Sequence, residues 1–326
     1  MTDTSGQAFR NFFERVTSHA PFAYQQRLGD QEWPDWVDVP TGLGKTAGVG
    51  VAWLHKRLRG DAATPRRLVY CLPMRVLVEQ TRRSFGEWIE AAAPAFEAAG
   101  REPPEVHLLM GGDADAPWAA EPERDAVIIG TQDMLLSRAL MRGYGMSRYQ
   151  WSIHFALLHN DALWVYDEVQ LMGPALATSA QLEGLRRDAA LTPTRPTRSL
   201  WLSATLNSDW LATVDLREHL PAMRPLTLNR EDAANPAVRD RREAGKPLRP
   251  AESRLSSDHT SLSGRRAYAA ALAAEVQDAH ARSDRGDTLV VLNTVERAQA
   301  LHDALARENA APLLVHARFR PHERRA

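Results

Sequence analysis

Two glycines, a lysine and a threonine follow one another closely in the segment DVPTGLGKT, residues 38–46. This segment comes after a short apolar run and before an amphipathic run with helical spacing. Gly42 and Gly44 allow backbone N–H groups to turn inward around an anion, and a lysine ammonium binds well between phosphate oxygens. The order of elements predicts a phosphate-binding loop in which Lys45 contacts phosphates and Thr46 binds Mg²⁺.

The composition of the chain supports a special role for this lysine. Of the 40 basic residues only three are lysines, at positions 45, 56 and 246, and the other 37 are arginines. A compact ammonium fits between phosphates where a planar guanidinium does not, which explains a lysine here in an arginine-rich chain. The alternative interpretation is a glycine turn that begins a helix and leaves Lys45 in solvent.

Two adjacent acids end the apolar run in LWVYDEVQ, residues 163–170. Unpaired buried carboxylates are costly, so burial alone does not account for two acids after four apolar residues. In phosphoryl-transfer sites one acid binds Mg²⁺ and another orients and deprotonates the attacking water. We therefore predict that Asp167 binds the metal and that Glu168 activates water. The alternative is an acidic strand end without a chemical role.

Short continuous apolar runs alternate with longer amphipathic runs along the first 220 residues. Continuous apolar runs are expected in a parallel sheet that is covered on both faces. The alternation predicts a doubly wound α/β sheet that binds its ligand at the carboxyl ends of the strands. The expected strands are 37–39, 68–73, 127–130, 163–167 and 199–203, and the expected helices are 46–58, 74–92, 131–142 and 174–187.

The character of the chain changes after this region. Residues 221–263 contain five prolines and the charged run RDRREAGK, which predicts a linker or irregular connection. Residues 264–326 then show a helix–strand–helix–strand pattern, with helices near 265–282 and 295–308 and strands at 288–292 and 313–316. About 60 residues are too few for a closed α/β domain. We expect a first domain over 1–220 and the start of a second one, inside which the chain stops.

Overall composition excludes several classes of protein. The 326 residues include 40 basic and 41 acidic ones, so polyanion binding requires a local basic surface and not a cationic coat. The single cysteine, Cys71, excludes an intramolecular disulfide and a cysteine-built zinc site. No apolar run is long enough for a membrane span, and the first 20 residues lack the apolar core of a secretion signal. The expected compartment is the cytoplasm, with no membrane partner.

Several segments together resemble the motifs of superfamily 2 DEAD/DEAH-like helicases. PTGLGKT (40–46), DEVQ (167–170) and SAT (203–205) are similar to motifs I, II and III, in that order. The motif in which a glutamine reads adenine is similar to FAYQQRL, residues 22–28. Motifs Ia and Ib are similar to residues 71–81 and 130–136.

Two further segments narrow the resemblance. VLNTVERAQALHDAL (291–305) and VHARFRPHER (315–324) look closest to the CRISPR-associated helicase of type I interference systems. In that family an Asn-Thr-Val stretch opens the central unit of the second domain, and a His-x-Arg-Phe segment follows it.

The resemblance implies a motor with two RecA-like domains that uses ATP and Mg²⁺ to move along single-stranded DNA. It further implies recruitment by a CRISPR surveillance complex. Carried over residue by residue, the ATP-binding residues are Gln25, which reads adenine, and Thr41, Gly42, Gly44, Lys45 and Thr46. The residues that couple hydrolysis to domain movement are Gln170, Ser203 and Thr205, and those that contact nucleic acid are Arg75, Thr131 and Gln132.

The sequence departs from the family pattern in three ways. Gln170 stands where histidine is usual, but an amide both donates and accepts, so a hydrogen bond to Ser203 or Thr205 is still expected. The dipeptide His302-Asp303 lies in a predicted helix without further ligands and is interpreted as surface, not as an HD nuclease. Motifs V and VI are not found, and motif VI normally supplies an arginine finger.

Two other functions stay open at this level. The chain could be a superfamily 2 remodeller that acts on RNA. It could also be a fragment that binds nucleotide or partners without catalysis. Because the second half of the ATP cleft is not seen in the sequence, we expect these 326 residues alone to bind nucleotide weakly and to hydrolyse ATP near background.

Overall fold

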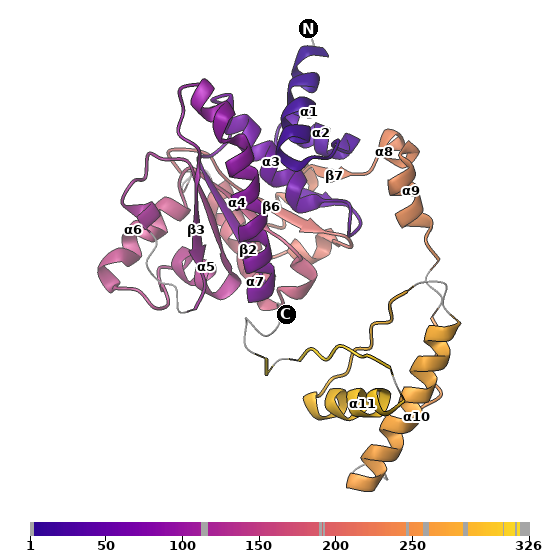
Figure 1. Cartoon of the computed structure of the whole chain (residues 1–326). Coiled ribbons are helices and arrows are strands. Elements are labelled where there is room, and N and C mark those ends of the chain that lie inside the picture. Colours follow the sequence, from indigo (N-terminus) through magenta and orange to yellow (C-terminus); the bar gives the residue numbers. More distant parts are fainter. Residues whose placement is uncertain are drawn as a thin grey trace. The chain divides into compact units, whose positions relative to one another are not determined.

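The computed structural model describes residues 3–111, 117–188, 191, 193–245, 248–256, 261–282, 286–308, 310–316 and 318–319. The chain divides into two compact units, Met1–Ala244 and Gly245–Ala326. In the first unit helices flank a seven-stranded sheet, and the second unit is built on two helices (Figure 1).

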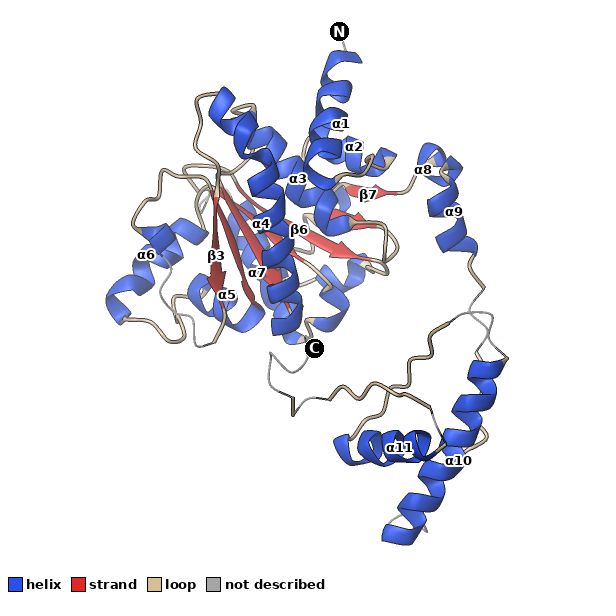
Figure 2. Ribbon diagram, in the orientation of Figure 1, coloured by secondary structure: helices blue, strands red, loops and turns tan. Residues whose placement is uncertain are grey.

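All strands of the sheet run parallel, in the order β3-β4-β2-β5-β6-β1-β7 (Figure 2). The five predicted strands are all present, and the doubly wound fold is confirmed. The sequence did not reveal β3 and β7, which are the two outermost strands of the sheet. The apolar runs of outermost strands are shorter and contain more polar residues. The strands are β1 (Trp36–Asp38), β2 (Arg67–Leu72), β3 (Glu105–Leu109), β4 (Ala126–Thr131), β5 (Ala162–Tyr166), β6 (Thr197–Ser203) and β7 (Pro225–Thr227).

Helices connect the strands and cover both faces of the sheet (Figure 2). The α-helices of the first unit are α1 (Asp3–Thr17), α2 (Ala23–Asp30), α3 (Lys45–Leu58), α4 (Arg75–Ala98), α5 (Gln132–Ala139), α6 (Arg148–Leu158), α7 (Pro174–Arg187), α8 (Arg230–Ala234) and α9 (Pro236–Glu243). Short 3₁₀ turns lie at Pro117–Ala119, Val169–Leu171, Ser208–Leu211 and Leu220–Ala222. None of the helices that the structure describes combines the length and the hydropathy that a membrane crossing needs.

The strands are apolar on both sides because each side has its own core. Along β2, Tyr70 and Leu72 belong to the cluster that packs under α1, α3 and α4. Val69 and Cys71, which alternate with them, belong to the cluster under α5 and α7. Side chains of a strand point alternately to opposite faces, so one continuous apolar run supplies both cores.

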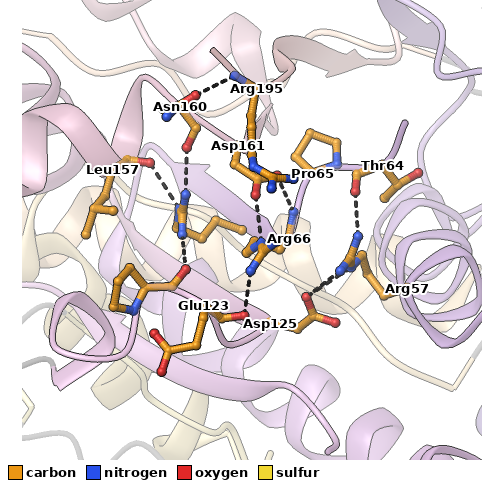
Figure 3. A network of polar contacts seen from close by, with 12 residues as sticks. Arg57, Thr64, Pro65, Arg66, Glu123, Asp125, Leu157, Asn160, Asp161 and Arg195 are labelled. Atoms are coloured by element: carbon orange, nitrogen blue, oxygen red, sulfur yellow. Dashed lines mark hydrogen bonds and ion pairs between the residues drawn. The ribbon is translucent and has the colours of Figure 1, made fainter. Parts of the chain in front are cut away.

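A network of arginines fixes the amino ends of the strands (Figure 3). Nε of Arg66 donates to Oδ2 of Asp161 at 2.7 Å, and Arg57 pairs with Asp125 at 2.8 Å. Arg67 is only 4% exposed. Its guanidinium donates to three backbone carbonyls, those of Pro122, Leu157 and Asn160. These contacts tie together the segments that lead into β2, β4 and β5.

The region predicted as an irregular linker is partly ordered, which corrects the prediction for 221–263. Residues 225–243 form β7, α8 and α9 and belong to the first unit. β7 pairs with β1, and Val238 of α9 is fully buried in the core. Pro225 and Pro236 do not interrupt these elements, because each is the first residue of its element.

The second unit contains the predicted helices but not the predicted strands. α10 (Leu262–Ala281) and α11 (Val295–Arg307) pack together (Figure 1). Residues 288–292 and 313–316 form no strand, because within the described residues neither segment has a strand partner. Val290 and Leu292 still pack against the helices, whereas Leu289 and Leu313 are almost fully exposed. Of the segment 315–324, residues 317 and 320–324 lie outside the described residues.

Candidate nucleotide-binding site

The predicted phosphate loop connects β1 to α3. Gly42 and Gly44 both have positive φ angles, 76° and 73°, which other residues adopt only with strain. Gly44 is the residue immediately before α3, so the loop delivers its N–H groups to the amino end of that helix. The side chain of Lys45 is buried, and its Nζ donates to the carbonyl of Val39 at 3.0 Å. Thr41 is exposed on the loop.

The acid pair lies beside this loop, as predicted. Asp167 and Glu168 follow β5, which is separated from β1 by only one strand, β6. Oγ1 of Thr46 donates to Oδ2 of Asp167 at 3.2 Å, although 121 positions separate the two residues. The parallel sheet brings them together because the carboxyl ends of all its strands meet at one edge.

Burial and neighbouring charges perturb the ionisable groups at this edge. Burial raises the pKa of Asp167, and a hydrogen bond from Tyr70 opposes that shift. Burial lowers the pKa of Lys45, while the carboxylates of Asp167 and Glu168 act in the opposite direction. Perturbed groups of opposite charge at the carboxyl edge of an α/β sheet are typical of a functional site.

The side chains at this edge fit the magnesium ion that the sequence predicts. The hydroxyl of Thr46 and the carboxylate of Asp167 are hard oxygen ligands that already lie within hydrogen-bond distance of each other. The described residues contain no group of three or more His, Cys, Asp or Glu side chains arranged to hold a metal. This small protein contribution suits Mg²⁺, which usually keeps water and phosphate oxygens among its ligands. A bound ion would neutralise phosphate charge there.

Gln170 connects the acid pair to the end of β6. Its Nε2 donates to Oε2 of Glu168, and its Oε1 accepts a hydrogen bond from Oγ of Ser203 at 3.0 Å. The expected contact with the SAT segment is therefore present. Ser203 Oγ in turn accepts the backbone N–H of Thr205 at 3.1 Å. This chain of hydrogen bonds runs from Glu168 to the SAT turn.

Gln25 also reaches the phosphate loop. It is 3% exposed, its Nε2 donates to the carbonyl of Gly44 at 2.8 Å, and its Oε1 accepts the N–H of Phe22. A Cβ on Gly48 would lie 3.1 Å from Cγ of Gln25, so the first turn of α3 needs glycine to admit the amide. The glutamine is thus held where the loop becomes a helix.

The three residues predicted to contact nucleic acid lie farther along the same edge. β2 and β4 are neighbours, with Leu72 opposite Thr131 in the register. Arg75 begins α4 just beyond β2, and its Nη2 donates to the carbonyl of Gly111 at 2.8 Å. Oε1 of Gln132 is buried and has no hydrogen-bond partner among the residues that the structure describes. The sheet therefore brings all three to strand ends that are distinct from those of β1 and β5.

Sequence reasoning missed one polar residue at the centre of the site. The hydroxyl of Tyr70 donates to Oδ2 of Asp167 at 2.7 Å, and burial next to that carboxylate raises the pKa of Tyr70 well above its usual value. The only signal in the sequence is a tyrosine within the apolar run LVYCL, where an aliphatic residue would serve the core equally well.

Comparison with known families agrees with this geometry. The profile of the DEAD/DEAH box helicases matches residues 28–214, more than half of the chain, and the chain belongs to that family. Members of this family hydrolyse ATP, typically with Mg²⁺. A search of curated proteins gives no significant match.

Solved structures show the same fold at low sequence identity. The chain is similar to S. cerevisiae Dbp5 L327V bound to RNA and ADP BeF3, with 15% identity, 98% of this chain and 69% of that chain covered, and a TM-score of 0.54. It is also similar to the DUF1998 helicase MrfA bound to DNA, with 15% identity, coverage of 100% and 42%, and a TM-score of 0.58. The chain thus spans less than half of the MrfA chain.

Proposed function

We propose that the chain is an ATP-dependent DNA helicase or translocase of CRISPR type I interference, acting in the cytoplasm. Within this proposal Lys45 and the loop N–H groups bind phosphates, Thr46 and Asp167 hold Mg²⁺, and Glu168 activates water. The observation that carries the ATPase part is the approach of Thr46 to Asp167 at 3.2 Å, next to the buried ammonium of Lys45.

The coupling role rests on Gln170. Because it bonds both Glu168 and Ser203, a change at the acid is transmitted to the turn that holds Thr205. We propose that this path links hydrolysis to domain movement, and that Arg75, Thr131 and Gln132 contact the backbone of single-stranded DNA. Their place beyond β2 and β4, apart from the phosphate loop, supports separate nucleotide and nucleic-acid sites.

Nucleotide binding is tested first, with Lys45→Ala and Lys56→Ala. Titration with ATP and Mg²⁺ should show that Lys45→Ala abolishes binding, because it removes the one ammonium that the described residues place at the loop. Lys56→Ala serves as the control, since that lysine lies at the other end of α3 and bonds the carbonyl of Gln31. Equal ATP binding by both variants and the unchanged chain would contradict the assignment of the site.

The choice of DNA rests on the segments 291–305 and 315–324 and on the likeness to MrfA bound to DNA. A remodeller that acts on RNA is the second candidate, favoured by the likeness to Dbp5 bound to RNA. Matched DNA and RNA duplexes with single-stranded tails distinguish the two, because we expect ATP-dependent strand separation only with DNA. Separation of the RNA duplex alone would select the second candidate.

The CRISPR assignment needs its own experiment. ATP hydrolysis is measured with a type I surveillance complex bound to target DNA and, as a control, with the same complex on DNA without a target. We expect stimulation only when the complex has displaced a strand. Stimulation by free single-stranded DNA together with indifference to the complex would leave a DNA helicase and refute the interference role.

A further inference from the structure

The segment that follows β7 is held against the candidate site by a buried aspartate. Asp232 of α8 is 1% exposed. Its Oδ1 accepts the backbone N–H of Tyr24 at 2.6 Å, and its Oδ2 pairs with Arg27 at 2.5 Å. Both partners belong to α2, which also carries Gln25. Because a buried carboxylate with several partners is costly to release, α8 is firmly attached to the helix beside the phosphate loop.

α9 continues from this attachment with a defined orientation. The side chain of Asn235 caps its first turn by accepting the N–H of Ala237 at 3.0 Å. Val238 is fully buried in the core cluster that also contains Leu43 of the phosphate loop. Residues three apart lie on the same face of a helix, so burial of Val238 turns Arg241 toward the body of the unit.

Arg241 lies directly against the phosphate loop. A Cβ built on Gly42 would be 3.1 Å from Nε of Arg241 and 3.7 Å from its Cδ and Cζ. The positive φ of Gly42 favours glycine at this position, and the guanidinium of Arg241 lies beside it. Within the described residues, Arg241 has no ion-pair partner.

Three positive groups thus gather at one place. They are the N–H groups of the loop at the amino end of α3, the ammonium of Lys45 and the guanidinium of Arg241. Each of the three attracts an anion. A guanidinium presents paired donors that match phosphate oxygens.

We propose that Arg241 binds the phosphate groups of the nucleotide, as a residue that α9 supplies to the site from the same unit. The segment interpreted from sequence as a solvated linker would then be part of the ATP site. The inference rests on the proposed binding of ATP and adds a residue to that site.

The experiment measures the affinities of the chain for ATP, ADP and AMP with Mg²⁺ by calorimetry, for the unchanged chain and for Arg241→Gln. Loss of one charged donor should weaken ATP binding about ten- to a hundredfold. ADP binding should weaken less and AMP binding least. Arg241→Lys, which keeps the charge without the planar fork, should restore part of the affinity for ATP.

Matched controls come from the same helix. Arg239 and Arg242 of α9 are exposed, and replacing either with Gln should leave all three affinities unchanged. Equal ATP affinity in Arg241→Gln, an increase in affinity, or an equal loss for ATP and AMP would each overturn the inference. If the unchanged chain bound no ATP, the proposed function itself would fail, which is a distinct result.

Discussion

The two edges of the sheet use charged residues in opposite ways. At the amino edge, Arg66 pairs with Asp161, and Arg67 donates to three backbone carbonyls (Figure 3). At the carboxyl edge, the hydrogen bonds of Lys45 within the described residues go to backbone carbonyls of its own loop, and burial disfavours the charge of both Lys45 and Asp167. The charged groups of the amino edge are hydrogen-bonded within the protein, whereas those of the carboxyl edge keep part of their hydrogen-bonding capacity for a ligand.

This contrast separates the charged residues that stabilise the fold from those that we expect to bind a ligand. Fully paired buried charges rigidify the segments that they join. Buried charges with weaker pairing are tolerated where ligand binding completes them. Substitutions at the amino edge should therefore change stability, and substitutions at the carboxyl edge should change chemistry.

The largest expected effect is on hydrolysis, in Glu168→Gln. The amide keeps the shape of the side chain but cannot take a proton from water. In a protein that also supplies the second half of the ATP cleft, the rate of ATP hydrolysis should therefore fall by about 10²–10⁴-fold. The rate is measured as phosphate release in the presence of single-stranded DNA, with protein in excess over ATP so that slow turnover is detected. Binding of ATP and the melting temperature should stay unchanged.

Two results at Glu168 would contradict the proposed difference between the amino edge and the carboxyl edge. Hydrolysis at the original rate would show that Glu168 does not activate water. A large drop in the melting temperature would show that the acid holds the fold, as residues of the amino edge do.

The next effect is on stability, in Arg67→Met. Methionine leaves three part-buried carbonyls without their charged donor, so the free energy of unfolding should fall by about 3–4 kcal/mol. Arg124→Met is the matched control, because Arg124 also has three partners, Glu102, Glu105 and Glu121, but at the surface. Exposed ion pairs contribute about 0–1 kcal/mol. Denaturant unfolding of the two variants measures the difference, and equal losses would contradict the comparison.

The sequence predicts the carboxyl edge much better than the amino edge. Lys45, Thr46, Asp167 and Glu168 follow apolar strands in short motifs, and parallel topology alone brings strand ends together. The partners of Arg67 are backbone carbonyls, which carry no residue identity and come from two distant segments, one at Pro122 and one at 157–160. No motif can reveal such contacts.

Two other features escaped prediction for different physical reasons. β7 has three residues and begins with proline, so it has too little apolar pattern to be recognised. α9 looks like a charged linker because only one of its side chains, Val238, is buried. In both cases tertiary contacts, and not local propensity, fix the structure.

The third prediction concerns the effect of pH on stability, through proton binding by a buried histidine. His159, just before β5, accepts a hydrogen bond from Nε of Arg186 at Nδ1 and bonds the carbonyl of Ala139 through Nε2, so its ring is neutral. Burial, followed by the charge of Arg186, lowers its pKa from 6.5 to about 4. The unfolded chain therefore takes up a proton first as the pH falls.

The contribution of His159 to the free energy of unfolding is fully present above pH 6.5 and is lost as the pH falls toward 4. At 1.36 kcal/mol for each pKa unit, the loss is about 3 kcal/mol. The measurement is the free energy of unfolding at several pH values in this window. His159→Gln, which keeps a donor and an acceptor, should reduce the pH dependence, whereas the control His302→Gln, at a partly exposed site, should not.

The smallest expected effect is in Tyr70→Phe, which tests whether any residue of the carboxyl edge is structural. The hydroxyl is the donor that Asp167 receives from a neighbouring strand, so its loss should lower the free energy of unfolding by about 1 kcal/mol. Tyr149→Phe, at a side chain that is 92% exposed, should cost nothing. Because the phenol donates to the carboxylate of Asp167 and its loss leaves the ammonium of Lys45 in place, ATP affinity should change far less than in Lys45→Ala. A loss of ATP binding as complete as in Lys45→Ala would mean that the phenol is part of the chemical site, and the division between supporting and reacting groups at this edge would have to be redrawn.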